Sequence, residues 1–308
     1  NGGAGSQVLA DYTTLTNNVV RGNASHGISV QGSFNEIVAT FAGTDPSGLV
    51  ADGNGGNGID VNGSDNCIGT RLDLFDVCDP SLADPASELT VLAANQGSGI
   101  DVLGERNLAP HAYVGLDANG DALGNQVDGV ELRRTLGATE GNVVEGNAIG
   151  ANGRDGIRME RTAFHVVRSN VIGIDALCFT DPRTNLGSGV YIDQSNIITV
   201  GGAGRFIDGG DGNLIGGNAL AGIHIDSAND LIAILGNTIG ISGDGLQRVQ
   251  NGFLGGVFVD TPNSNVVIGD NTISGEDVGV HLIGSGVVVR SNRIGTNDFG
   301  EHGSVPGQ

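Results

Sequence analysis

One short phrase, glycine followed by isoleucine or valine, any residue and then an apolar residue, occurs nine times along the 308-residue chain. The glycines that open successive copies are separated by 31, 41, 30, 27, 33, 33, 34 and 23 residues. The nine copies occupy residues 27–30, 58–61, 99–102, 129–132, 156–159, 189–192, 222–225, 256–259 and 279–282. Repetition at this period is typical of a solenoid, in which each repeat forms one coil and is stable only when stacked on its neighbours.

A second phrase follows most copies: a short apolar strand ends in Gly-Asn, Ser-Asn or Asp-Asn, and a further isoleucine comes two residues later. The asparagines of the clearest copies are Asn147, Asn170, Asn237, Asn271 and Asn292. Their spacing places one at the same corner of each coil, where a side-chain amide can hydrogen-bond the equivalent amide of the next coil. We therefore predict an internal asparagine ladder along the axis.

The alternation of these phrases predicts an all-β fold, a single-stranded right-handed parallel β-helix of about nine coils. Strands of three to five residues bury every second side chain, and parallel pairing with the coils on either side satisfies their backbone groups. The 55 glycines and 7 prolines fit many short strands joined by tight turns. The glycine before each Ile or Val fits a corner that either needs a positive φ or has no room for a Cβ atom. We predict one domain over 1–308, as a segment of a larger protein.

Extra length is expected at one corner, which puts the loop insertions on one side of the solenoid. Similar loops occur at 43–48, 115–120 and 295–300, the largest insertion spans Thr70 to Gln96, and a shorter one spans Asp175 to Leu186. The three cysteines are too few for a disulfide framework. Cys67 and Cys78 lie eleven positions apart at the two ends of one apparent insertion, so they either form a disulfide that staples this loop or remain free thiols along with Cys178.

The formal net charge is −21, and all 14 basic residues are arginines. So acidic a surface excludes nucleic acid and anionic lipid as expected partners and favours divalent cations or neutral and cationic ligands. No run of about 18 apolar residues is present, so we expect no membrane span.

Within each Gly-Ile-Xaa-Val phrase the third residue should point outward, which predicts one column on a single sheet. Its members are Ser29, Asp60, Asp101, Glu131, Arg158, Tyr191, His224, Phe258 and His281. Asp60, Asp101 and Glu131 are successive carboxylates that should repel one another unless a cation or Arg158 compensates. They are candidate metal ligands, and with Arg158 they are the candidate catalytic residues. Tyr191, His224 and Phe258 form a candidate platform for stacking sugars.

A second column follows just after these strands, at Glu160, Asp193, Asp226 and Asp260. Asp and Glu at strand exits commonly hydrogen-bond their own backbone and cap turns, which is the structural interpretation of this column. The functional interpretation is a calcium site beside an arginine.

The phrases Gly-Asn-Xaa-Ile-Gly, Ile-Gly-Thr-Asn-Asp-Phe-Gly and Gly-Asn-Gly-Gly-Asn-Gly-Ile resemble those of bacterial extracellular right-handed parallel β-helix repeat proteins. The resemblance covers nearly the whole chain and implies a pectate-lyase-like architecture. It also implies a choice of functions, because that family includes carbohydrate lyases, hydrolases and epimerases as well as tailspikes, adhesins and surface proteins. In the lyases Ca²⁺ neutralises a uronate carboxylate and a basic residue removes the adjacent proton, which makes Ca²⁺ the one cofactor to expect here.

Two functions from different classes follow. The first is a non-catalytic extracellular or cell-surface protein, part of a surface layer, adhesin, appendage or filament, that binds glycan, calcium or neighbouring copies of itself. The alternative is a polysaccharide-active lyase, epimerase or hydrolase with a groove along the outward column. The even repetition and the absence of a recognisable catalytic motif favour the first.

Overall fold

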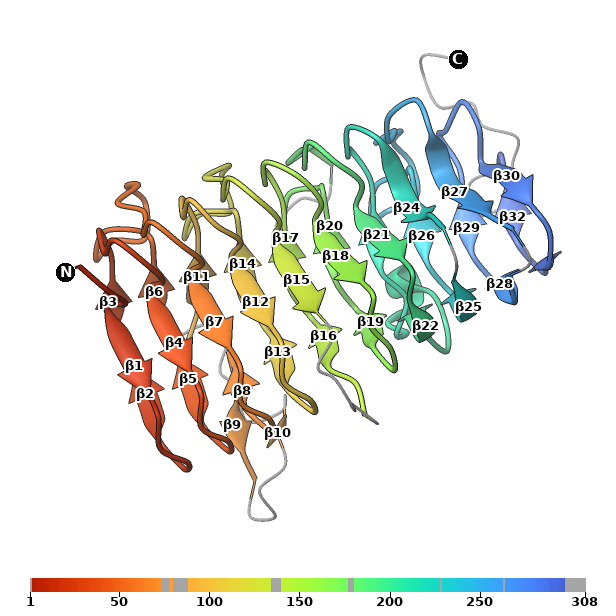
Figure 1. The fold of residues 1–308 in the computed structure, drawn as a ribbon. Helices are drawn as coiled ribbons and strands as arrows, with labels where there is room; N and C mark the ends of the chain where they lie inside the picture. Colours follow the sequence, from red (N-terminus) through yellow and green to blue (C-terminus); the bar gives the residue numbers. More distant parts are fainter. Residues whose placement is uncertain are drawn as a thin grey trace.

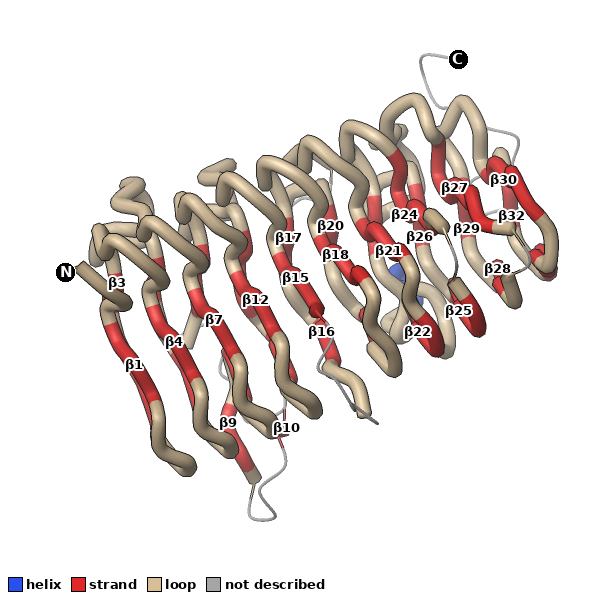
Figure 2. Tube along the Cα trace, viewed as in Figure 1, coloured by secondary structure: helices blue, strands red, loops and turns tan. Residues whose placement is uncertain are grey.

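The computed structural model describes residues 2–73, 78–79, 88–133, 140–176, 180–227, 229–262 and 264–296. The chain winds through three parallel sheets of ten strands each, so that each coil contributes one strand to every sheet. Figure 1 shows the coils following one another along a rod in chain order. Figure 2 shows that regular structure is almost entirely strand, and the one helix within the described residues is the 3-10 helix η2 (Phe206–Asp208).

Sheet A contains the first strand of each coil. Its strands are β1 (Ser6–Val8), β4 (Ile28–Val30), β7 (Ile59–Val61), β12 (Ile100–Val102), β15 (Val130–Arg133), β18 (Ile157–Glu160), β21 (Val190–Asp193), β24 (Ala221–Ile225), β27 (Gly255–Thr261) and β30 (Val280–Gly284).

Sheet B contains the second strand of each coil. Its strands are β2 (Thr14–Thr16), β5 (Glu36–Val38), β8 (Cys67–Ile68), β13 (Leu108–Pro110), β16 (Val143–Glu145), β19 (Val166–Arg168), β22 (Asn196–Gly201), β25 (Asp230–Leu235), β28 (Val266–Gly269) and β31 (Val287–Arg290).

Sheet C contains the third strand of each coil. Its strands are β3 (Val19–Val20), β6 (Phe41–Ala42), β11 (Thr90–Leu92), β14 (Ala112–Val114), β17 (Ala148–Ile149), β20 (Val171–Ile172), β23 (Leu214–Ile215), β26 (Thr238–Ile239), β29 (Thr272–Ile273) and β32 (Arg293–Ile294).

The ten coils include one more than the nine predicted, because the first coil begins with Gly5-Ser6 in place of glycine and an aliphatic residue. Inward side chains of all three sheets form one continuous aliphatic core, with Ile59, Ile100 and Ile157 fully buried in sheet A. The repeated glycines lie where neighbouring coils approach most closely. A Cβ on Gly58 would stand 2.7 Å from the carbonyl oxygen of Gly99. Since these glycines do not have positive φ, close packing is the reason for them.

Three asparagine ladders run inside the corners, where the sequence analysis predicted one. The predicted ladder, at the corner between sheets B and C, connects Nδ2 to Oδ1 over 2.9–3.1 Å from coil 5 onward. Its members are Asn147, Asn170, Asn213, Asn237, Asn271 and Asn292. Each amide also bonds main-chain groups, which satisfies the buried polar atoms of the turn.

A longer ladder occupies the corner between sheets C and A. Its members are Asn23, Asn54, Asn95, Asn125, Asn152, Asn185, Asn218 and Asn251. It ends at Glu276, whose Oε1 accepts from Asn251 Nδ2 at 2.7 Å. The third ladder lies between sheets A and B and consists of Asn35, Asn66, Asn107 and Asn142. It ends at the buried His165, whose Nδ1 accepts from the Asn142 backbone N–H at 2.8 Å.

The corner loops between sheets C and A occur on every second coil. Loops of coils 2, 4, 6 and 8 are each closed by an antiparallel bridge: Thr44 with Ala51, Leu116 with Ala122, Ile174 with Pro182, and Ile241 with Arg248. Loops two coils apart touch, since Ala118 N–H donates to Gly48 O at 3.1 Å. A bridged loop has two chain segments side by side and is about 10 Å wide, twice the coil spacing, so the coil between has no room for one.

The largest insertion differs from its prediction. It leaves the coil after β8, at the corner between sheets B and C, and it contains β9 (Arg71–Leu72), β10 (Cys78–Asp79) and the sheet C strand β11. Cys67 of β8 and Cys78 of β10 form a disulfide, with 5.6 Å between their Cα atoms, so these two are not free thiols. Residues 202–212, which contain η2, extend from this same corner farther along the rod. Cys178 and residues 297–300 of the final predicted loop lie outside the described residues.

Candidate functional site

The predicted outward column exists on sheet A in the predicted order. Strand register places each member beside the next one from Ser29 to His281. Figure 1 shows sheet A as a continuous face along the rod. The column has two chemically different parts, an acidic segment on coils 3–5 and an aromatic segment on coils 7–10, with Arg158 on coil 6 between them.

The acidic segment is covered by its neighbours. Asp101 is only 3% exposed, and Arg133 holds it through Nε at 2.7 Å from Oδ1 and through a second contact from Nη2. Asn57 Nδ2 donates to Asp101 at 3.1 Å and to Asp60 at 3.4 Å. Burial raises the pKa of Asp101 although Arg133 opposes the rise, and burial beside Asp101 raises the pKa of Glu131. Arg133 is therefore the cation paired with Asp101, whereas Arg158 pairs with Asp155 and Glu160.

Asp128 adds a carboxylate that the sequence analysis missed. It precedes Gly129 at the corner, is fully buried, and accepts the Asp155 backbone N–H at 2.9 Å. Its other oxygen lies 3.4 Å from Arg154 Nη1. Burial raises the pKa of Asp128 to about 7, while Arg154 acts against the rise. The only sequence signal for Asp128 is that it is a polar residue immediately before the repeated glycine, and such a residue is typical of an ordinary turn.

The described residues contain no group of three or more His, Cys, Asp or Glu side chains that could hold a metal ion. Asp60, Asp101 and Glu131 are neighbours in register, but the hydrogen bonds of Asp60 and Asp101 go to asparagine and arginine side chains. A calcium role for them stays a prediction.

The aromatic segment is a continuous row of rings. Tyr191 and His224 meet edge to face at 5.1 Å between centroids, and Phe258 lies 4.9 Å from His224 and 5.0 Å from His281. Arg158 caps the row, its guanidinium carbon 4.3 Å from the centre of the Tyr191 ring. Phe258 is only 7% exposed because the flanking rings cover it, whereas Tyr191 and His224 are half-buried and His281 is exposed.

Arg158 is held in place from two sides. Its guanidinium donates to Asp155 at 3.0 Å and to Glu160 at 2.8 Å, and the side chain is 14% exposed. The carboxylates raise the pKa of Arg158 against the opposing effect of burial. A guanidinium in this setting carries positive charge and orients Tyr191, but it does not exchange a proton.

The carboxylates of the strand exits form a second row beside the rings. The Tyr191 hydroxyl donates to Asp226 Oδ2 at 2.7 Å and connects the two rows. Burial and the nearby Asp226 raise the pKa of Tyr191. Burial would raise the pKa of Asp226, but hydrogen bonds from Tyr191 and Ser227 lower it. Burial lowers the pKa of His224, so this imidazole is neutral at neutral pH.

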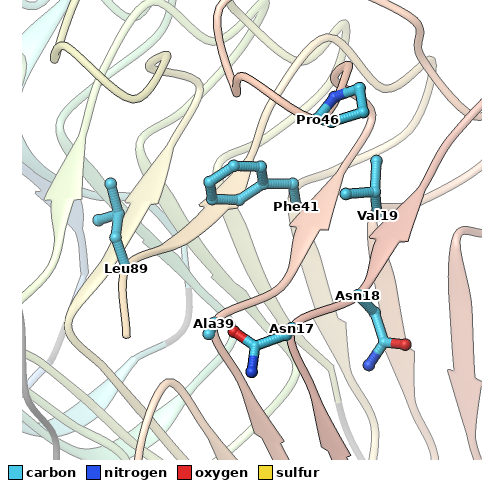
Figure 3. A pocket seen from close by; sticks show the side chains of 7 residues that line it. All are labelled: Asn17, Asn18, Val19, Ala39, Phe41, Pro46 and Leu89. Carbon is cyan, nitrogen blue, oxygen red and sulfur yellow. The ribbon is translucent and has the colours of Figure 1, made fainter. Parts of the chain in front are cut away.

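A separate hollow lies away from sheet A, over the first strands of sheet C. Figure 3 shows Phe41 between Val19 and Leu89, with Pro46 on one side and asparagines on the other. Its volume is about 340 Å³, and none of the seven lining residues titrates. It offers space for an apolar group and no acid or base chemistry.

Three ten-stranded parallel sheets wound by one chain define a right-handed parallel β-helix protein, as the sequence analysis predicted. No helix among the described residues is long and apolar enough to cross a membrane. No family model matches the chain, and a search of the curated proteins finds no relative.

Three solved structures are similar in shape. The A-module of the mannuronan C-5 epimerase AlgE4 from Azotobacter vinelandii is 14% identical, with a TM-score of 0.39 over 94% of this chain and 74% of that one. The Dettilon tailspike protein is 12% identical, with a TM-score of 0.44 over 94% of this chain and 60% of that one. The AlgE6 A-module from the same bacterium is 16% identical, with a TM-score of 0.31 over 95% and 91%. The fold assignment rests on strand register, not on these similarities.

Proposed function

We propose that this β-helix is an extracellular or cell-surface protein that binds a polysaccharide along the outer face of sheet A. The observation that carries the proposal is the row of four rings from Tyr191 to His281, backed by Arg158 and bordered by carboxylates. Aromatic rings pack against the C–H faces of sugars, and neighbouring carboxylates accept hydrogen bonds from sugar hydroxyls. The disulfide fits a protein exposed to an oxidising environment.

The four rings differ in exposure, and we therefore propose different roles for them. Tyr191, His224 and His281 present ring surface and polar edges to a ligand, whereas Phe258 is covered and keeps the neighbouring rings at their spacing. Coils repeat about every 4.8 Å, close to the length of one sugar residue in an extended chain. A polysaccharide lying parallel to the rod axis would therefore meet one outward side chain for each sugar. Such binding suits a surface-layer, adhesin, appendage or filament component that also contacts neighbouring copies.

Binding to a panel of immobilised oligosaccharides, followed by calorimetry on those that bind, tests this proposal. We expect Tyr191→Ala and His281→Ala each to weaken binding about fivefold, since stacking of one ring contributes on the order of 1 kcal/mol. Tyr12→Ala is the matched control, because Tyr12 is a 63% exposed tyrosine on the first coil, outside the aromatic segment. Equal loss in Tyr12→Ala, or no binding to any oligosaccharide, would contradict the proposal.

A polysaccharide-active enzyme is the second candidate, and the contact of Tyr191 with both Asp226 and His224 favours it. A phenol, a carboxylate and a neutral imidazole in contact are the groups needed to add and remove protons at a sugar carbon. Arg158 would then orient Tyr191, not act as the base. Incubation with uronate polysaccharides with and without Ca²⁺, following absorbance of unsaturated product, tests this candidate. Turnover that Tyr191→Phe abolishes would establish it, and no turnover on any substrate would remove it.

A further inference from the structure

Three carboxylates beside the aromatic row have no cationic partner. Asp193, Asp226 and Asp260 form no ion pair with any described residue. Four carboxylates elsewhere on sheet A and its corners are paired: Asp101 with Arg133, Asp128 with Arg154, and Asp155 and Glu160 with Arg158. Asp60 and Glu131 of the acidic segment form no ion pair with a described residue either, although Arg133 lies near both. The aromatic segment differs because its unpaired carboxylates stand beside rings.

Asp193 is a carboxylate whose hydrogen-bonding capacity is only partly satisfied. The residue is 9% exposed, its Oδ2 accepts from Gln194 Nε2 at 3.1 Å, and its Oδ1 is buried with no hydrogen-bond partner. Burial and the charges of Asp226 and Glu160 raise its pKa. A buried carboxylate oxygen without a donor is costly to the fold, and a nearby positive ligand would reduce that cost.

The carboxylates follow the rings coil by coil. Asp193 ends the strand that carries Tyr191, Asp226 follows the strand of His224, and Asp260 lies two residues after Phe258. The hydrogen bond from Tyr191 to Asp226 joins one ring to the carboxylate of the next coil. A ligand stacked on the rings therefore has one negative charge beside it on each of three successive coils.

We infer that the aromatic face recognises a polysaccharide with free amino groups, a cationic polymer of amino sugars; this inference rests on the proposed function. A sugar stacked on the row would direct its ammonium group toward the adjacent carboxylate. A polyuronate would place carboxylates against carboxylates on a chain whose net charge is −21. The Arg158 guanidinium beside these rings is already ion-paired with Asp155 and Glu160, so it offers little attraction for an anion.

Calorimetry with three oligosaccharides of matched length tests this inference. The probes are glucosamine oligomers with free amines, the same oligomers fully N-acetylated, and oligouronates, at a pH where the amines are protonated. We expect the free-amine oligomer to bind at least about tenfold more tightly than the acetylated one, since three partly exposed charge pairs each contribute a few-fold. We also expect this preference to shrink as salt is added.

Charge-removing variants locate the effect. Asp226→Asn and Asp260→Asn should each weaken free-amine binding about two- to fivefold more than they weaken binding of the acetylated oligomer. Asp270→Asn is the matched control, because Asp270 is an exposed aspartate at the corner between sheets B and C whose φ of 59° suits asparagine.

The outcomes separate the inference from the proposed function. Acetylated or uronate oligomers that bind equally or better, with binding lost in Tyr191→Ala, would overturn the amino-sugar inference and leave glycan binding intact. No binding by any probe, nor by any glycan of the wider panel, would overturn both. Equal effects of Asp226→Asn and Asp270→Asn would show nonspecific attraction to an acidic protein and would also overturn the inference.

Discussion

The two halves of the rod have the same backbone and different interiors and faces. Coils 2–5 have an asparagine ladder between sheets A and B and an acidic outward segment, whereas coils 5–10 have a ladder between sheets B and C and an aromatic outward segment. Beyond coil 5 the corner residue changes from Asn142 to His165 and then to the inward Ile198 and Ile232. The parallel register continues unbroken through this change.

This difference teaches that stacking sets few limits on what points outward. The glycines, the inward aliphatic residues and one ladder of eight asparagines run through both halves and hold the coils together. In the acidic half Asp60 and Asp101 are buried, and Asp101 is paired with Arg133, so these charges act mainly on stability. In the aromatic half they are partly open and uncompensated, so they are available to a ligand.

Removing Arg133 should have the largest effect and should destabilise only the acidic half. Arg133→Met leaves the buried Asp101 without its cation and should lower the free energy of unfolding by about 2–3 kcal/mol, toward the low end for buried pairs because the arginine side chain is 42% exposed. Urea denaturation measures the loss. Combining Arg133→Met with Asp101→Asn should restore most of the stability. A single variant as stable as the wild type would show that Asp101 is not paired as described.

His165, where the ladder between sheets A and B ends, should show the next largest effect. His165→Ala leaves the Asn142 N–H without an acceptor and opens a cavity, at a cost of about 2 kcal/mol. Because burial lowers the pKa of His165 to about 4, the unfolded chain binds a proton first as pH falls below its ordinary value of 6.5. The wild type should lose stability between these two values. His165→Asn should lack that loss in unfolding midpoints measured across pH, and an unchanged pH profile would contradict the assignment.

Glu276 should show a smaller effect of opposite pH dependence in the other half. Burial raises the pKa of Glu276 to about 7 from an ordinary 4.5, so the folded state binds the extra proton and stability is lost as pH rises between these values. Glu276→Gln keeps an acceptor for Asn251 and should stabilise the protein by about 1–2 kcal/mol above pH 7. Glu140→Gln, at a 57% exposed side chain, is the control. Stability that stays flat with pH in both proteins would contradict this prediction.

Tyr191→Phe should change stability least, by under about 1 kcal/mol, because the ring stays in the row and one partly exposed hydrogen bond is lost. The measurable consequence is electrostatic. Without the hydroxyl, the pKa of Asp226 should rise toward its ordinary value, since Tyr191 helps to lower it. An NMR titration of the Asp226 carboxyl carbon measures this pKa. No change would mean that the two side chains are not hydrogen-bonded in solution.

Most of the outward column was predictable, because period-two alternation fixes which side chains leave the coil and the nine glycines fix their order. Arg133 was not predictable as the partner of Asp101. It lies in the next coil, two residues beyond Glu131, and only the stacked register brings it beside Asp101. Glu276 occupies a ladder position that carries asparagine in the preceding coils, so repetition pointed away from it. Asp128 occupies a turn position that is polar in both neighbouring coils, Ser98 and Asp155, so nothing in the sequence distinguished it. The covering of Phe258 by two imidazoles likewise follows from ring orientations, which a sequence pattern does not contain.

By itself, the sequence determined a β-helix with a registered outward column, because inward aliphatic residues and close-packed glycines allow one way of stacking the coils. The tertiary structure decided which charges are paired, where each ladder begins and ends, and why corner loops skip alternate coils. These outcomes depend on contacts between residues about thirty positions apart and on the width of a loop relative to the coil spacing. Local sequence patterns contain neither these long-range contacts nor the width of a loop.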